Sequence, residues 1–334
     1  MNALDSKDLN TFQAPVIREL EALESDLKDA LRSDLPLLQE ISAALTEAPG
    51  KRIRPNMLFL ASRCTCGSPE KAAAAALAVE LIHTATLLHD DILDAHMTRR
   101  GRPTVFARWG ADSAMIMGDY LFSKAFARLG EAKLDSAIEV LAKVTNLMSL
   151  GELIQLQTRK DIDVSEEDYM EMIYRKTASL FSAASECGAL TGNGSEKFRS
   201  EFASFGENIG LAFQITDDLL DYLAADVQIG KPIASDFTEG RVTLPFISAF
   251  RNAPEESRER VRELFHSSFD DEANWNEVVS FIQNYGGIEY SLNKARELGE
   301  KAKGALTPVS PSRERDALCF AADYIVHRIS PFTA

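Results

Sequence analysis

The sequence predicts an all-α protein of ten or more helices, and two observations lead to this fold class. Apolar residues recur at spacings of three and four along most of the chain, with charged residues between them, as in 12–32, 111–130 and 291–306. Alternating strand patterns are nearly absent. With 334 residues and 45% hydrophobic composition, the chain can bury a sizeable core.

The helical segments are separated by short breaks rich in Gly, Pro, Ser and Asn. These breaks fall at 48–55, 66–70, 191–195, 230–240, 251–256, 286–287 and 307–312. None is long enough to be an interdomain linker, and no repeat or low-complexity tract is present. We therefore predict a single domain over 1–334, with the motifs in a core of about 48–245 and more charged, peripheral helices over about 250–334.

Composition excludes several classes of protein. The formal charge of -15 and the pI near 4.9 argue against a nucleic-acid binder, because a phosphate backbone requires a basic face. The four cysteines lack paired zinc spacing and disulfide density, so we interpret them as reduced thiols. The start lacks a signal-peptide pattern, and no uninterrupted apolar run reaches bilayer length. These features predict a cytoplasmic protein without a stable membrane anchor.

Two acidic clusters interrupt apolar helical segments. The stretch LLHDDILD contains Asp90, Asp91 and Asp94, and FQITDDLLDY contains Asp217, Asp218 and Asp221. On a helix, each set of three carboxylates projects from neighbouring positions on one side, where like charges repel. A solvated helix surface would explain one such cluster. Two such clusters in apolar surroundings instead favour a metal-binding role. Carboxylates are hard oxygen ligands that suit Mg²⁺, which completes its coordination shell with water and substrate phosphates.

Short basic clusters lie near these acids in the sequence. They are PGKRIRP with Lys51, Arg52 and Arg54; MTRRGRPT with Arg99, Arg100 and Arg102; IYRKTASLF with Arg175, Lys176 and Thr177; and IGKPIASDFTEGR with Lys231 and Arg241. Basic residues at loops and helix ends are usually only solvated. Their repeated placement beside two acidic clusters predicts a clamp that holds a polyphosphate through metal ions and direct contacts.

In their order and spacing, the motifs resemble those of the trans-type polyprenyl diphosphate synthases, the polyprenyl synthetase family. The matching motifs run from about 48 to 245: GKRIRP, HTATLLHDDILD, MTRRGRPT, MGDYLFSKAF, GELIQLQ, YRKTASLF, FQITDDLLDY and GKPIASDFTEGRVTLP. The resemblance implies an all-α fold around a deep central cavity and a homodimer. It also implies Mg²⁺-dependent head-to-tail condensation of isopentenyl diphosphate with an allylic diphosphate.

The resemblance assigns roles residue by residue. Asp90, Asp94 and Asp217 would bind metal, about three Mg²⁺ per active site, and Asp91, Asp218, Asp221 and Lys176 complete the catalytic set. The allylic diphosphate would contact Arg99, Lys176, Thr177, Gln214 and Lys231, and isopentenyl diphosphate would contact Lys51, Arg54, His83 and Arg100. His83 lies two helical turns before Asp90, on nearly the same face. Arg241 and Ala234 depart from the commonest family residues, lysine and glycine, which leaves the contact at Arg241 open.

The length of the product depends on the space beside the first acidic helix. Family members that stop early have aromatic residues four or five positions before the first aspartate, where this chain has Thr86 and Ala85. A helix from Glu70 to Asp90 rises about 30 Å, which matches a tail of roughly six to eight isoprene units. We therefore expect a hexa- to octaprenyl product made from a primer such as farnesyl diphosphate, as used for quinone side chains. Phe122 or Phe126 is expected to form the floor.

Other functions fit the sequence less well. A geranylgeranyl diphosphate synthase differs only in chain length, and a terpene cyclase usually has an Asn/Ser/Glu pattern in place of the second acidic motif. Two E-x-x-H pairs, Glu80 to His83 and Glu263 to His266, would fit a di-iron helix bundle but leave six aspartates unexplained. A noncatalytic subunit of a heteromeric synthase typically lacks the acidic motifs, which are intact here.

Overall fold

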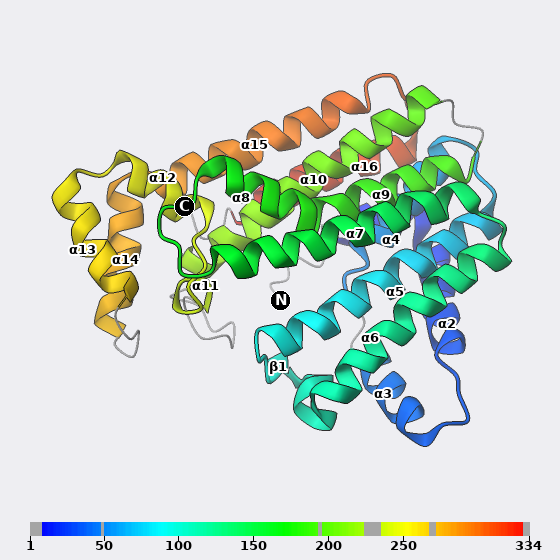
Figure 1. The fold of residues 1–334 in the computed structure, drawn as a ribbon. Coiled ribbons are helices and arrows are strands. Elements are labelled where there is room, and N and C mark those ends of the chain that lie inside the picture. Colours follow the sequence, from blue (N-terminus) through cyan, green and yellow to red (C-terminus); the bar gives the residue numbers. More distant parts are fainter. Residues whose placement is uncertain (1–8, 48–49, 193–195, 224–234, 267–271, 330–334) are drawn as a thin grey trace. The chain divides into compact units, whose positions relative to one another are not determined.

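The computed structural model describes residues 9–47, 50–192, 196–223, 235–266 and 272–329 (Figure 1). The elements are η1 (Ala14–Val16), α2 (Ile17–Ala30), α3 (Pro36–Thr46), α4 (Ile53–Cys64), α5 (Pro69–Leu93), β1 (Thr98–Arg99), β2 (Arg102–Pro103), α6 (Val105–Glu131), α7 (Asp135–Thr158), α8 (Glu166–Ile173), η2 (Tyr174–Ala178), α9 (Ser179–Leu190), α10 (Glu196–Leu223), α11 (Ser235–Thr238), α12 (Leu244–Asn252), α13 (Glu255–His266), α14 (Glu272–Asn284), α15 (Gly287–Ala305) and α16 (Arg313–His327).

The predicted all-α fold class is confirmed, with more than ten helices among the described residues. The sheet in this part of the chain is one small antiparallel pair, in which Thr98 faces Pro103 and Arg99 faces Arg102. The helices near 12–32, 111–130 and 291–306 that the periodicity predicts are α2, α6 and α15. Helix α6 contains a kink at Gly110, whose φ of 82° lies in the left-handed region that glycine adopts without strain.

Chain contacts divide the protein into two compact units. Unit 1 contains residues 1–145, 180–206 and 306–318, and unit 2 contains residues 146–179, 207–305 and 319–334. Helices α7, α10 and α16 contribute residues to both units. The single domain over 1–334 stays a prediction.

Helix α5 is the central helix of unit 1. It begins after Ser68, whose hydroxyl accepts the N–H of Lys71, and Pro69 occupies its first turn, where a missing N–H costs nothing. A run of alanines follows, which favours the helix and lets neighbouring helices approach closely. Its side chains are buried nearly all round from Ala72 to Ile82. Helices α2, α4 and α6 pack on it, and Figure 1 shows α5 and α6 side by side.

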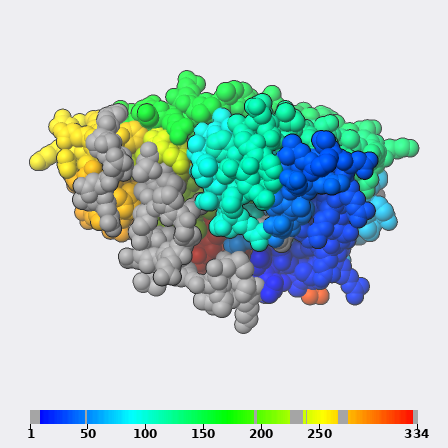
Figure 2. Space-filling view, turned by 90° about the horizontal axis from the view of Figure 1, so that it is seen from below, coloured from blue at the N-terminus to red at the C-terminus, as the bar shows by residue number. Residues whose placement is uncertain are grey.

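The N-terminal helices cover part of this core. Helix α2 buries Leu20, Leu23 and Leu27, one apolar stripe, and packs against α3, α4 and α5. Helix α3 contacts α6, and the blue N-terminal residues lie beside the turquoise residues of α6 in Figure 2. Helix α6 therefore contacts both α5 and α3.

Helix α5 has the length and apolar composition of a membrane-spanning helix. Among the described helices it alone is long and apolar enough to cross a membrane, with a mean hydropathy of 1.4 over its most apolar window. Glu80 interrupts the apolar residues of this helix, so the expectation that no uninterrupted apolar run reaches bilayer length is not contradicted. In addition, 67% of that window is buried inside the protein, as is usual for the core helix of a folded domain.

Unit 2 is organised around buried aromatic residues. The rings of Phe237, Phe246 and Phe281 form a chain of contacts with centroid separations of 5.3 and 5.9 Å. Helices α14 and α15 pack on α12, the helix that carries Phe246. Tyr222 at the end of α10 stacks on Trp275 of α14, with an interplanar angle of 15°. These contacts hold the C-terminal end of α10 within unit 2.

Candidate active site

Both acidic clusters lie at the C-terminal ends of long helices. Asp90 and Asp91 are in the last turn of α5 and Asp94 caps it, while Asp217, Asp218 and Asp221 lie in the last two turns of α10. The final turns of these two fully described helices contain no basic residue. Acids at the negative end of a helix dipole are unfavourable, and so are like charges three or four residues apart. Nearby positive charges stabilise such an arrangement.

The first cluster divides into an outward pair and an inward residue. Asp90 and Asp94 are half-buried and one turn apart, and the N–H of Asp94 donates to the carbonyl of Asp90 at 2.9 Å. Asp91 is only 4% exposed. It accepts a hydrogen bond from Nε of Arg99 at 2.9 Å and forms an ion pair with Nη2 of the same guanidinium at 2.8 Å. Burial raises the pKa of the Asp91 carboxyl, and the charge of Arg99 opposes this change.

The second cluster repeats this division. Asp217 is exposed and Asp221 half-buried, whereas Asp218 is 5% exposed. Asp218 accepts from the hydroxyl of Tyr169 at 2.6 Å and from Nε2 of Gln214 at 2.7 Å. Burial, reinforced by the charge of Asp236, raises the pKa of Asp218 well above its ordinary value. In both D-D-x-x-D motifs, the second aspartate faces the protein and accepts hydrogen bonds from it.

The outward carboxylates fit a divalent cation. Mg²⁺ prefers hard oxygen ligands and uses one or two carboxylates with water and phosphate oxygens. Asp90 and Asp94 in unit 1, and Asp217 in unit 2, present such oxygens at helix ends that lack an intrahelical basic partner. These three are the residues that the sequence predicts as metal ligands, and this assignment stays a prediction.

Unit 1 brings together several of the residues predicted to bind isopentenyl diphosphate. The Arg54 guanidinium stacks on the Phe181 ring, 4.1 Å from its centroid, and its Nη1 lies 3.3 Å from Nε2 of His83. Burial lowers the pKa of Arg54 to about 10, so the side chain remains charged at neutral pH. Burial and the charges of Arg54, Arg100, Arg99 and Arg52 lower the pKa of His83 well below its usual value. His83 is therefore a neutral imidazole among fixed cations.

The other basic residues of this unit differ in their availability. Arg52 adopts a left-handed φ of 51° and pairs with Glu24 and Glu80, so its charge is already compensated. Lys51 is half-buried, and its carbonyl accepts from Gln13 at 2.9 Å. Arg100 is exposed and packs over Gly50, where an added Cβ would lie 2.9 Å from the guanidinium. Gly50 therefore leaves room for the Arg100 side chain.

Lys176 and Thr177 of unit 2 lie in an unusual turn. Residues Tyr174–Ala178 form a single π-helical turn between α8 and α9. Such turns are rare and often mark functional sites. Lys176 Nζ lies 2.7 Å from Glu152 and 3.1 Å from Gln155, and Thr177 donates to Oε1 of Gln214 at 2.8 Å. Gly151 permits α7 to approach this turn, because a Cβ there would lie 2.7 Å from the backbone nitrogen of Lys176.

The loop after the second cluster is described only in part. Lys231, predicted to bind the allylic diphosphate, and Ala234 lie outside the described residues. Arg241 is half-buried and pairs with Asp236 at 3.1 Å and with Glu239 at 2.6 Å. Its charge is compensated within its own segment, so a direct role in diphosphate binding gains no support.

Two residues near the second cluster were missed by sequence reasoning. Tyr169 of α8 is 1% exposed and donates to Asp218. Arg328, just after α16, donates to the carbonyl of Phe213 at 2.8 Å and to Thr216 at 3.0 Å, and lies 3.4 Å from Asp217. Neither lies in a basic or acidic motif, and both reach α10 from distant parts of the chain. Their roles depend on tertiary contacts.

The residues predicted to control product length lie on α5 and α6. Ala85 has no exposed surface, whereas Thr86 is half-buried and shares the face of Asp90, one turn away. Phe122 and Phe126 are half-buried on α6, and the Phe122 ring lies 6.0 Å from the ring of His89. The role of these four residues stays a prediction.

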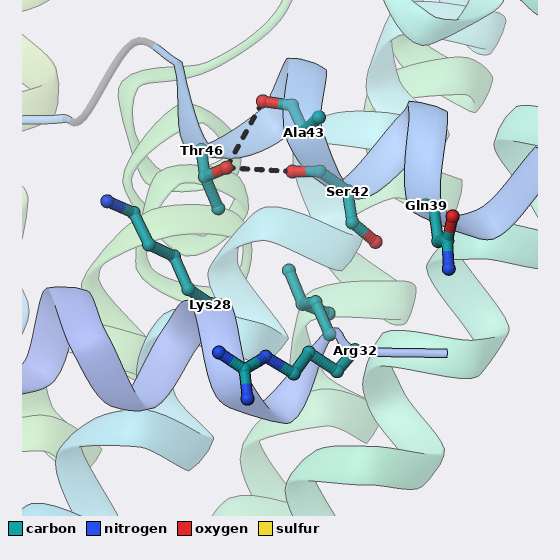
Figure 3. Close-up of a pocket in the computed structure, with 7 residues that line it drawn as sticks. Lys28, Arg32, Gln39, Ser42, Ala43 and Thr46 are labelled. Atoms are coloured by element: carbon teal, nitrogen blue, oxygen red, sulfur yellow. Dashed lines mark hydrogen bonds between the residues drawn. The ribbon is translucent and has the colours of Figure 1, made fainter. Parts of the chain in front are cut away.

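A small surface groove between α2 and α3 is lined by residues outside the predicted site (Figure 3). It has a volume of about 190 Å³ and is lined by Lys28, Leu31, Arg32, Gln39, Ser42, Ala43 and Thr46. Thr46 uses its hydroxyl within α3, on the carbonyls of Ser42 and Ala43. None of these seven residues belongs to the sequence motifs, so the groove adds nothing to the candidate site.

The fold, together with the aspartate clusters at the C-terminal ends of α5 and α10, defines an isoprenoid synthase of the all-α type. The family model for the polyprenyl synthetases matches residues 35–282. The chain therefore belongs to the polyprenyl synthetase family and is a prenyltransferase of the polyprenyl diphosphate synthase class.

Known relatives span different product lengths. A short chain isoprenyl diphosphate synthase from Methanothermobacter thermautotrophicus is 38% identical over 313 residues, 92% of this chain and 96% of the relative. An octaprenyl diphosphate synthase from Haemophilus influenzae is 32% identical over 328 residues, 98% of this chain and 99% of the relative.

A solved structure supports the fold. A polyprenyl synthase from Caulobacter crescentus, crystallised with calcium and isoprenyl diphosphate, superposes with a TM-score of 0.89 at 33% identity. The comparison covers 96% of this chain and 98% of that protein.

Proposed function

We propose that this prenyltransferase condenses isopentenyl diphosphate with an allylic diphosphate in successive head-to-tail steps, giving an all-trans polyprenyl diphosphate of about six to eight isoprene units. The observation that carries the proposal is the acidic helix end, present twice in a chain of this family. A buried aspartate supports an outward-facing carboxylate at each end. This arrangement is suited to an anionic substrate that arrives with divalent cations.

Magnesium is the proposed cofactor, held by Asp90 and Asp94 at one helix end and by Asp217 at the other. When bound, it would neutralise the charge that develops on the diphosphate as the allylic C–O bond ionises. The polyprenyl synthase from Caulobacter crescentus was crystallised with calcium, a hard divalent cation of the same ligand preference. The expected number of about three ions per site follows from the family resemblance.

For isopentenyl diphosphate we propose Arg54, His83, Lys51 and Arg100 as the binding residues. Arg54 is fixed by its stacking on Phe181, so its charge is presented without loss of side-chain freedom at binding. A neutral His83 that accepts from Arg54 through Nε2 has its Nδ1–H free to donate to a phosphate oxygen. Arg52 is not included, because Glu24 and Glu80 already pair with it.

The allylic diphosphate is proposed to contact Arg99, Lys176, Thr177, Gln214 and Lys231. In the structure, the first two of these cations already have acidic partners, Asp91 for Arg99 and Glu152 for Lys176. The diphosphate would replace or share these partners. The double bond of isopentenyl diphosphate attacks the allylic carbocation, and the departing diphosphate takes the proton that is then lost. We assign no side chain as base.

We propose a homodimer as the working form. The exposed apolar side chains include neighbouring residues on two helices: Met115 and Ile116 of α6 are 50% and 64% exposed, and Leu150, Leu153 and Leu156 of α7 are 37%, 60% and 42% exposed. On α7 these three leucines follow one another at a spacing of three residues, which makes a continuous stripe. Exposed apolar stripes of this kind usually mark an interface with another chain.

The test is an incubation of the purified protein with farnesyl diphosphate, excess isopentenyl diphosphate and Mg²⁺, followed by chain-length analysis of the dephosphorylated products. We expect a ladder that ends near six to eight units. A ladder that stops at four units would make the protein a geranylgeranyl diphosphate synthase. Absence of elongation from any allylic primer would refute the proposal.

A further inference from the structure

A continuous chain of hydrogen bonds runs through unit 2 from α8 to the π-helical turn. The hydroxyl of Tyr169 donates to Oδ2 of Asp218 at 2.6 Å, and Nε2 of Gln214 donates to Oδ1 of the same carboxylate at 2.7 Å. Thr177 then donates to Oε1 of Gln214 at 2.8 Å. Tyr169, Asp218 and Thr177 are 1%, 5% and 8% exposed, so the bond between Tyr169 and Asp218 is buried, whereas Gln214 and its two bonds are part-buried.

Two hydrogen bonds set the orientation of the Gln214 amide. The amide turns its nitrogen toward Oδ1 of Asp218, to which it donates. Its oxygen then faces Thr177, whose hydroxyl becomes the donor. One orientation of the Gln214 amide satisfies both neighbours, and the amide is thereby locked between α10 and the π-helical turn.

The network sets how the second acidic cluster is presented. With Asp218 held inward by two donors, the neighbouring Asp217 projects outward from α10. The first cluster is built the same way with a different donor, because the guanidinium of Arg99 holds Asp91 inward. The second aspartate of each motif, Asp91 or Asp218, is thus held inward by different donors. This recurrence indicates that the inward position of this aspartate contributes to function.

We propose that Tyr169 is a positioning residue of the second acidic cluster. Its hydroxyl anchors Asp218, and through Gln214 it aligns the cluster with Thr177 on the π-helical turn. Tyr169 touches neither metal nor substrate in this role. The inference rests on the proposed function, since the aligned groups are those proposed to bind the metal and the allylic diphosphate.

The test compares two Tyr→Phe variants. Tyr169→Phe keeps the buried ring and removes only the donor to Asp218. Tyr290→Phe is the matched control: this hydroxyl also donates to a carboxylate of unit 2, Glu166 at 2.7 Å, which keeps Lys294 and Arg251 as partners. Calorimetric binding of inorganic pyrophosphate in the presence of Mg²⁺ is measured for both, together with the Mg²⁺ concentration for half-maximal elongation.

For Tyr169→Phe we expect pyrophosphate binding about tenfold weaker and a half-activating Mg²⁺ concentration about tenfold higher, the usual effect of one lost bond to a charged group. The KM for isopentenyl diphosphate should stay unchanged, and Tyr290→Phe should match the wild type in every measurement. Wild-type pyrophosphate affinity and Mg²⁺ dependence in Tyr169→Phe would overturn the proposal, whatever its melting temperature.

A second variant keeps the proposal testable should Tyr169→Phe not fold. In Asp218→Asn the amide cannot accept from both Tyr169 and Gln214, but the outward carboxylates remain. We expect weaker pyrophosphate binding that high Mg²⁺ restores; a loss that no Mg²⁺ concentration restores would make Asp218 a metal ligand and overturn the positioning role. Pyrophosphate binding is measured directly and does not depend on elongation. A wild-type protein that fails to elongate would therefore refute the proposed function, while the binding data would still test the positioning role of Tyr169.

Discussion

At the scale of single residues, position on the helix decides what each aspartate of a cluster does. Asp90 and Asp94 are one turn apart and half-buried, whereas Asp91 between them turns inward to Arg99. Asp218 turns inward in the same way toward Tyr169 and Gln214. The motif D-D-x-x-D therefore combines outward carboxylates with one buried anchor, and identical residue types in one motif have different tasks.

Asp90→Ala should lower the turnover number by roughly a thousandfold, because it removes a proposed metal ligand. The fold should stay intact or gain slightly in stability, since one of several like charges at a helix C-terminus is lost. Steady-state kinetics at saturating Mg²⁺ and thermal unfolding check both parts. Glu131→Ala is the matched control, an acid in the last turn of α6, and it should leave turnover unchanged. Near-normal turnover of Asp90→Ala would count against the metal assignment.

His83 should make the stability of the protein depend on pH. The pKa of His83 in the folded protein is lowered well below its usual value, so the unfolded chain binds a proton that the folded protein does not. Stability is therefore lost as pH falls below about 6.5, with a slope of at most about 1.4 kcal/mol per pH unit. Urea unfolding between pH 5 and 7 measures this slope. His83→Gln should reduce this slope; equal slopes in the two proteins would contradict a neutral His83 in the folded protein.

At the scale of elements, the π-helical turn between α8 and α9 is the feature that periodicity did not reveal. A helical pattern runs from 166 to 190 without a break in the sequence, and the structure places one wider turn at Tyr174–Ala178 within it. The extra residue changes the direction in which Lys176 and Thr177 point. The spacing of apolar residues cannot predict this change. Apolar positions along a helix already vary by about one residue, so one inserted residue is not recognised in the pattern.

Gly151→Ala tests the packing of that turn. The new Cβ would lie 2.7 Å from the backbone nitrogen and 3.0 Å from the Cα of Lys176, and a backbone cannot give way as a side chain can. We expect the free energy of unfolding to fall by about 1–3 kcal/mol and the KM for the allylic substrate to rise. Gly304→Ala on α15, with nothing within 4 Å, should instead stabilise by about 0.5–1 kcal/mol. Chemical denaturation measures the free energy of unfolding of both variants. Equal stability of Gly151→Ala and the wild type would disprove the close contact.

At the scale of the whole molecule, the proposed homodimer explains why apolar side chains remain in water on α7. Leu153→Glu places a charge in the middle of the leucine stripe, where Leu153 is 60% exposed. We expect the molar mass from light scattering to shift from dimer to monomer, because an interface does not accept an unpaired charge. Lys301→Glu, an exposed change on α15, is the control. A dimer that persists in Leu153→Glu would place the interface elsewhere.

Product length is the property of the whole molecule that depends on the tail path beside α5. Ala85→Phe should shorten the product if the tail passes this residue. Ala85 has no exposed surface, so Thr86→Phe on the half-buried face of Asp90 serves as a second variant that disturbs packing less. Radiolabelled products separated by chain length provide the measurement. Unchanged products from both folded variants would refute the proposed path.

The sequence by itself determined the helical fold class, the family and the positions of most candidate residues. Helical periodicity is a local property, and the acidic and basic motifs are contiguous, so both can be read along the chain. It also located the breaks near 66–70, 286–287 and 307–312, where Gly, Pro and Ser end the helices that the structure contains. These features require no knowledge of which helix packs against which.

Only the tertiary structure decided which residues of each motif face the protein. Tyr169 and Arg328 reach α10 from sequence positions far away, and Glu24 and Glu80 neutralise Arg52 from two other helices. Burial and partnership arise from long-range packing, which residue spacing along one helix does not specify. The physical reason is that a helix fixes the angle between its own side chains, while its neighbours determine whether each side chain meets water, a donor or an opposite charge.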